Sequence, residues 1–179
     1  MEMDKSIKRA RRRPLFLPGE SSKALSLGVE AIHAMVPHRA PFLLVDAITA
    51  VDTQELAALG KRYIDPKDPI LAGHFPGDPV YPGVLLVEAM GQLCLCLHHL
   101  LQNGGEVDRQ AGPPSLRLMK IKDATFLAEV RPGDEITLVG KQIEDNGYTQ
   151  VCIGQVLKGE TICAVTAVEV IQIDASQEQ

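Results

Sequence analysis

The chain has 179 residues, of which 45% are hydrophobic and 23% charged, enough apolar mass for one soluble domain with a sizeable core. Its net charge of −5 is uneven, because residues 1–23 carry seven Lys or Arg and three Asp or Glu, which leaves −9 on the remainder. Phosphate binding needs a basic surface, so the acidic body excludes a nucleic-acid-binding protein. Four cysteines without a Cys-x-x-Cys pair, and no recognisable secretory segment, predict reduced thiols in a cytoplasmic protein.

Residues 1–25 are rich in arginine and lysine, contain few large apolar residues and show no clean periodicity. Charged termini of low hydrophobicity seldom fold, so this stretch is predicted to be a disordered N-terminal tail. Contact with an acidic partner, binding to an anionic membrane surface and organelle targeting remain as functional alternatives. The folded domain is expected over residues 26–175.

The domain begins with a short amphipathic pattern over residues 26–36, which predicts a helix that ends before Pro37. Residues 42–51 then predict a strand, and residues 56–64 its hairpin partner across the turn at 52–54. His38 and Arg39, just before the first of these strands, are expected to stabilise the fold rather than to react.

A proline-rich loop over residues 72–83 carries His74 and leads into an apolar run over residues 84–101. Three prolines and three glycines exclude helix and regular strand from the loop, whereas the apolar run predicts a helix enclosed by other structure. A membrane span is the competing interpretation, but a carboxylate one turn into the run argues against it. Glu88 and Gln92 lie four residues apart and therefore share one face of this helix.

Four further strands are predicted over residues 116–128, 135–144, 148–157 and 161–173, after a polar connection from 102 to 114. Asn146 and Gly147 form a strong hairpin turn signal between two of them. Six strands can bury a single long apolar helix only if an antiparallel sheet curls around it, so an α+β fold is expected.

Several motifs in register resemble the 3-hydroxyacyl-acyl carrier protein dehydratases of fatty acid synthesis. They are Pro-His-Arg-Ala-Pro-Phe-Leu-Leu-Val-Asp at 37–46, His-Phe-Pro-Gly at 74–77, Pro-Gly-Val-Leu at 82–85, Val-Glu-Ala-Met at 87–90 and Val-Arg-Pro-Gly-Asp at 130–134. The resemblance implies the hot dog fold and an acyl carrier protein as partner. It also implies an assembly of homodimers, either a dimer or a trimer of dimers, whose active sites combine His74 of one subunit with Glu88 of the other. No cofactor is expected.

Dehydration needs a base for a weakly acidic α-proton and an acid for the departing hydroxyl. An imidazole titrates near neutral pH, which suits His74 as the base, although a structural histidine is the default interpretation of such a loop residue taken alone. Glu88 on an apolar helix is expected to be desolvated, which favours the protonated acid, with a structural bridge as its alternative. Gly83, at the start of the long helix, offers an unpaired N–H to the thioester oxygen, and Phe75 and Gln92 are expected to help line the substrate site.

Two other readings of the same residues remain open. A bifunctional dehydratase-isomerase is one, since residues 77–83 resemble that sister family, although it typically carries Asp where Glu88 stands. A non-catalytic acyl-binding or scaffold subunit is the other, although binding alone requires neither His74 nor Glu88. Cys94 and His98 lie four apart, but two ligands on one helix do not make a metal site, so no metal is expected.

Two stretches depart from the resembled family. Residues 116–118 lack the Tyr or Phe that commonly gates the acyl tunnel, and residues 125–130 lack the usual basic side chains. Arg117, Lys120 and Lys122 lie within six residues, and strand alternation places the two lysines on one face. These three residues are therefore the predicted docking patch for an acidic carrier protein, with a solvated strand face as the alternative.

Overall fold

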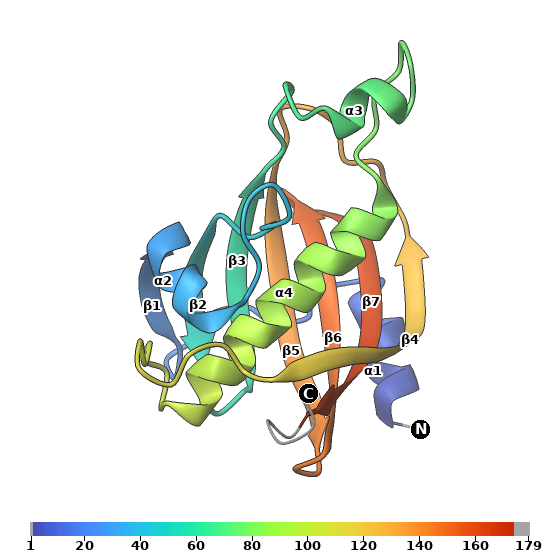
Figure 1. The fold of residues 1–179 in the computed structure, drawn as a ribbon. Helices are drawn as coiled ribbons and strands as arrows, with labels where there is room; N and C mark the ends of the chain where they lie inside the picture. The colour runs from blue at the N-terminus through green and yellow to red at the C-terminus, as the bar shows by residue number, and fades with distance from the viewer. Residues whose placement is uncertain (1, 174–179) are drawn as a thin grey trace.

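The computed structural model describes residues 2–173, which form one curved antiparallel sheet with a long helix against its concave face (Figure 1). The seven strands lie in the order β1-β2-β3-β5-β6-β7-β4, and every neighbouring pair is antiparallel. The sheet does not close into a barrel, because β1 and β4 remain as edges. The elements are α1 (Glu2–Ala10), β1 (Lys23–Gly28), α2 (Val29–Met35), β2 (Ala47–Asp52), β3 (Ala57–Tyr63), α3 (Ile70–Gly73), α4 (Gly83–Gln102), β4 (Leu116–Phe126), β5 (Glu135–Asp145), β6 (Thr149–Lys158) and β7 (Thr161–Gln172).

Helix α4 is the centre of the main hydrophobic core. Met90, Leu93 and Leu97 are fully buried on it, and its contacts are with β5, β6, β7 and β3. Gly154 on β6 permits this close approach, since a Cβ there would lie 2.5 Å from Cβ of Met90. Although α4 is long and apolar enough to cross a membrane, it is the core helix of a soluble fold. The expectation of an antiparallel hot dog sheet around one helix is therefore confirmed.

The sheet has seven strands rather than the six expected. The additional strand, β1, covers the end of the predicted tail and the start of the helix predicted over residues 26–36, and it pairs with β2. Helix α2 accordingly begins only at Val29 and ends at Met35, immediately before Val36 and Pro37. The strand was missed because it has only six residues, of which only Leu25 and Leu27 pack against the core, and because it crosses the predicted boundary at residue 26.

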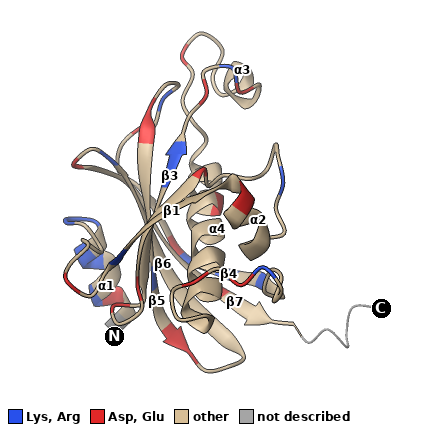
Figure 2. Ribbon diagram, turned by 90° about the vertical axis from the view of Figure 1, so that its left-hand side faces the viewer, with Lys and Arg blue, Asp and Glu red and all other residues tan. Residues whose placement is uncertain are grey.

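The prediction of a disordered N-terminal tail is wrong for the described residues from 2 onward. Helix α1 and the segment that follows it lie on the outer face of the sheet, where Ile7, Ala10 and Phe16 are buried (Figure 2). Gln155 of β6 is fully buried and accepts a hydrogen bond from the Leu15 amide at 2.8 Å, while its own amide donates to carbonyls of the segment.

The physical reason for this correction lies in β6. Alternate residues of the strand point to opposite faces, so Gly154 faces α4 whereas Ile153 and Gln155 face the N-terminal segment. A strand covered on both faces has no polar alternation, and residues 150–157 are all buried. The absence of charged residues between Gln150 and Leu157 was the sequence signal for a second covering layer.

Candidate active site

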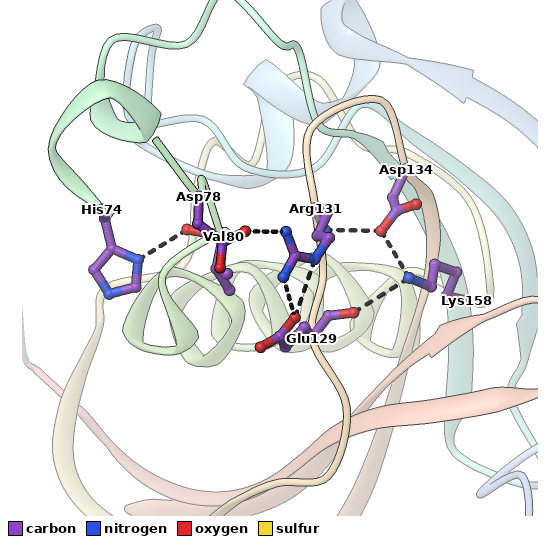
Figure 3. Close-up of polar contacts among 7 residues, drawn as sticks. All are labelled: His74, Asp78, Val80, Glu129, Arg131, Asp134 and Lys158. Carbon is purple, nitrogen blue, oxygen red and sulfur yellow. Dashed lines mark hydrogen bonds and ion pairs between the residues drawn. The ribbon is translucent and has the colours of Figure 1, made fainter. Parts of the chain in front are cut away.

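His74 lies in the loop that joins α3 to α4, with its ring held in one orientation. Its Nδ1 is 2.8 Å from the carbonyl oxygen of Val80 (Figure 3). A carbonyl can only accept, so Nδ1 carries a proton and donates, and Nε2 is the nitrogen that can act as a base. The ring of Phe75 stacks on the imidazole at a centroid distance of 4.0 Å. The loop therefore fixes which ring nitrogen of His74 is available to exchange a proton.

An ionic network around Arg131 fixes this loop from outside (Figure 3). The guanidinium donates to Asp78 at 2.6 Å and to Glu129 at 2.6 Å. The hydrogen bond from Arg131, together with its charge, lowers the pKa of Asp78, and hydrogen bonds to Asp78 and Glu129 raise the pKa of Arg131. Asp134 in turn accepts from the Arg131 amide at 2.8 Å and from Lys158 at 3.0 Å. The Pro-Gly-Asp motif thus supports the loop that carries His74.

Gly83 is the first residue of α4, and its amide lies at the positive end of the helix dipole. Phe126, at the end of β4, covers it closely, since a Cβ at Gly83 would lie 2.7 Å from Cε1 of Phe126. His74, Gly83 and Phe126 line one pocket of about 500 Å³, here called the His74 pocket. Only glycine leaves room for a ligand between the aromatic ring and the helix terminus.

Glu88 lies one and a half turns into α4, in a second pocket of about 310 Å³, here called the Glu88 pocket. The Gln92 amide donates to Oε1 of Glu88 at 2.9 Å and to the carbonyl of Phe42 at 2.8 Å, and its oxygen accepts from the Leu44 amide at 2.8 Å. Nε2 of His38 lies 3.4 Å from the same Glu88 oxygen. The Glu88 side chain is 29% exposed, so the expected desolvation is only partial within one chain.

The two predicted catalytic residues do not line a common pocket within one chain. The residues around His74 come from the 80–86 and 126–130 segments, whereas those around Glu88 come from residues 37–38, the middle of α4, β4 and β7. No residue belongs to both pockets. Each pocket therefore holds one of the two residues that were predicted to form an acid–base pair.

The other predicted site residues have varied positions. Gln92, 1% exposed, donates to Glu88 and also lines the Glu88 pocket, and Phe75 is 55% exposed beside His74. Of the predicted docking residues, Arg117 lines the Glu88 pocket and Lys122 forms an ion pair of 2.9 Å with Glu169. Two irregularities in the register of β4 interrupt the alternation on which the shared face of the lysines was based.

Phe126 and the contact of His38 with Glu88 were missed by sequence reasoning. Phe126 belongs to the stretch recognised only for its lack of basic residues, and nothing in periodicity pairs it with Gly83. His38 was expected only to stabilise the fold. The available signal for Phe126 was an aromatic residue at the exposed end of the strand before the Pro-Gly-Asp motif.

Among the described residues 3–173, no group of three or more His, Cys, Asp or Glu side chains could hold a metal ion. The described cysteines are all buried, and burial raises the pKa of Cys96 to about 12. Such thiols behave as core side chains rather than as ligands or nucleophiles.

Comparison with known proteins identifies the class first. The sequence matches the FabA-like domain family over residues 36–167, and the chain belongs to that family. Within the family it is similar to 3-hydroxyacyl-[acyl-carrier-protein] dehydratase FabZ. The enzyme of Brucella abortus (strain S19) is 32% identical over 87% of this chain and 90% of its own length. The enzyme of Anaeromyxobacter sp. (strain Fw109-5) is 36% identical over 73% of this chain and 80% of its own length.

Solved structures support the same fold. The dehydratase heterocomplex ApeI:P from Xenorhabdus doucetiae superposes with a TM-score of 0.62 at 13% identity, covering 82% of this chain and 93% of that one. The uncharacterized protein PH1136 from Pyrococcus horikoshii superposes with a TM-score of 0.55 at 15% identity, covering 79% of this chain and 92% of that one. At these identities the likeness concerns the fold alone.

Proposed function

We propose that this chain is a hydro-lyase that dehydrates a 3-hydroxyacyl thioester on an acyl carrier protein to the trans-2-enoyl thioester. Nε2 of His74 takes the α-proton, and the electrons left on carbon form the new double bond as the C–O bond breaks. Glu88 gives its proton to the departing hydroxyl, which leaves as water. The Gly83 amide stabilises the charge that develops on the thioester oxygen.

The single observation that carries this proposal is the hydrogen bond between Nδ1 of His74 and the Val80 carbonyl. It fixes the tautomer and leaves a basic nitrogen directed away from the loop, in a pocket that also contains the Gly83 amide. A base and an oxyanion donor in one largely apolar pocket match the two demands of α-proton removal from a thioester.

The active site is proposed to form between two copies of the chain. Strand β4 is an open edge, and Leu118, Met119 and Ile121 on it are 54%, 52% and 49% exposed. An edge strand with exposed apolar side chains is a surface that a second strand would cover. Pairing of two such edges in a homodimer would bring β4, which ends at Phe126 and contributes Arg117 to the Glu88 pocket, next to its counterpart. This contact supports a homodimer, and the trimer of dimers is proposed on the family resemblance alone.

Carrier recognition is proposed to take place on strand β4. The loop of residues 127–131 offers no unpaired basic side chain, since Arg131 is engaged by Asp78 and Glu129. Arg117, Lys120 and Lys122 therefore stay the proposed docking residues, with Lys122 already paired to Glu169. A cytoplasmic location, where carrier-bound acyl chains are made, is proposed with it.

Incubation of the purified chain with short, medium and long 3-hydroxyacyl carrier proteins tests the function. Mass spectrometry should detect the loss of one water from at least one of them, and chromatography of the released acids should show the trans-2 isomer. A cis-3 product would identify the bifunctional dehydratase-isomerase instead. A scaffold subunit would leave every substrate unchanged and would refute the proposal.

A further inference from the structure

His38 is the one side chain besides Gln92 whose polar atom faces the carboxylate of Glu88 within the described residues, with Nε2 3.4 Å from Oε1. The two donors approach from different elements, His38 from the segment before β2 and Gln92 from the next turn of α4. Both approach the same oxygen. The second oxygen, Oε2, makes no hydrogen bond within the described residues, in a pocket of about 310 Å³.

The position of His38 is itself fixed. Its ring lies 6.0 Å from the ring of Phe42 in a tilted arrangement, and Arg39 holds the backbone on both sides by donating to the carbonyls of Val36 and His38 at 3.0 and 2.7 Å. Gln92 secures the other end of the same segment through Phe42 and Leu44. The imidazole is therefore presented to Glu88 by a segment that α4 itself anchors.

The tautomer of His38 follows from its other nitrogen. Nδ1 is buried and has no hydrogen-bond partner within the described residues, so a proton there would be a buried donor without an acceptor. The tautomer with its proton on Nε2 avoids this cost and directs a donor at Glu88.

We infer that His38 is a positioning residue which, together with Gln92, holds Oε1 of Glu88 and leaves Oε2 as the oxygen that exchanges a proton with the substrate hydroxyl. The 3.4 Å contact shortens to a hydrogen bond when substrate fills the pocket, as catalytic contacts do on complex formation. The inference rests on the proposed function, since it assigns an atom to the acid of that reaction. It adds a specific role for a residue outside the acid–base pair.

The test replaces His38 in the full chain with leucine, which fills space without a donor, and with glutamine, which offers an N–H at a similar reach. His38→Leu should lower kcat roughly ten- to hundredfold at an unchanged KM, because the acid loses its orientation. Loss of one donor to the anion should also shift the pH limit set by Glu88 upward. His38→Gln should recover most of both effects. His33→Gln, on α2, is the matched control and should behave as wild type.

An unchanged kcat in His38→Leu would overturn the inference, as would a glutamine variant that is as impaired as leucine at an unshifted pH profile. A measurement on the wild-type chain is independent of variant folding and of turnover. ¹⁵N-resolved NMR of the imidazoles at pH 7 should show a proton on Nε2 of His38, and a ring protonated on Nδ1 alone would contradict the geometry. Absence of turnover in the wild type would instead refute the proposed function.

Discussion

The His74 pocket and the Glu88 pocket hold their reactive groups by different means. His74 lies on a loop whose outer support is a network of exposed ion pairs, in which Arg131 is 42% and Asp78 72% exposed. Glu88 lies on the core helix and is held by Gln92, a buried amide whose other hydrogen bonds go to backbone groups. Exposed ion pairs contribute little stability and are screened by salt, whereas a buried amide is costly to disturb. His74 is thus supported by exposed ion pairs on a loop, and Glu88 by a buried amide on the core helix.

The largest effect is expected from the two reactive groups themselves. His74→Ala should abolish turnover, and Glu88→Gln should reduce kcat by about 10²–10⁴, because each removes one half of the general acid–base pair. Circular dichroism should show an intact fold for both, since neither side chain belongs to the main core cluster. A variant with wild-type kcat would show that its residue has been given the wrong role.

A large effect on activity is also expected from crowding the Gly83 amide. Gly83→Ala should lower kcat/KM by about tenfold or more, because its Cβ would meet the ring of Phe126 at 2.7 Å and narrow the approach to the N–H. Steady-state kinetics check this. The double variant Gly83→Ala with Phe126→Leu should recover part of the loss, and strictly additive losses would mean that the two residues do not share the pocket.

Two variants compare the support of Glu88 with that of the His74 loop: Gln92→Leu removes the buried amide, and Arg131→Ala removes the exposed ion pairs. Gln92→Leu should lower the free energy of unfolding by about 1–3 kcal/mol, since it leaves the buried Leu44 amide and the Phe42 carbonyl without partners. Arg131→Ala should change stability much less, because its ion pairs are exposed. Denaturant titrations measure both. Equal losses of stability in the two variants would contradict the difference between the buried amide that supports Glu88 and the exposed ion pairs that support the His74 loop.

The sequence was sufficient for the parts of the molecule that follow periodicity and local chemistry. The long helix, the four later strands and the loop that carries His74 all lie within a few residues of their predicted bounds, although the unpredicted helix α3 extends to Gly73, two residues into the predicted loop. Helix α1 and strand β1 were missed because neither is stable alone: α1 is ordered by packing on β6 and β7, and β1 by pairing with β2. Charged composition argued for disorder, and tertiary contacts decided otherwise.

In the candidate site, too, local chemistry could be predicted from the sequence, whereas contacts between distant segments could not. His74, Glu88 and Gly83 could be named because they stand in motifs that resemble a known family and because proton transfer and oxyanion stabilisation need such groups. The contacts of Gly83 with Phe126 and of Glu88 with His38 join segments more than 40 residues apart, and no local pattern encodes them. Only the packed sheet and helix bring those pairs together.

The smallest effect is expected from acid titration of the loop support. Pairing with Arg131 depresses the pKa of Asp78 below its ordinary 3.8, so its stabilising effect is fully present above about pH 4 and is lost as pH falls through the depressed value. Hydrogen exchange of the loop amides should therefore rise in that acid window for wild type. Asp78→Asn should show fast exchange at neutral pH already, and identical pH profiles for the two chains would contradict the role of this pair.

Subunit mixing most directly tests the claim that the two pockets are halves of one site. Inactive His74→Ala and Glu88→Gln chains are mixed, allowed to exchange subunits, and assayed for loss of water from a 3-hydroxyacyl carrier protein. Each mixed dimer would contain one site with both residues intact, so random exchange should restore roughly one quarter of wild-type activity. No recovery after exchange has been verified by native mass spectrometry would contradict the shared site and require His74 and Glu88 to meet within one chain.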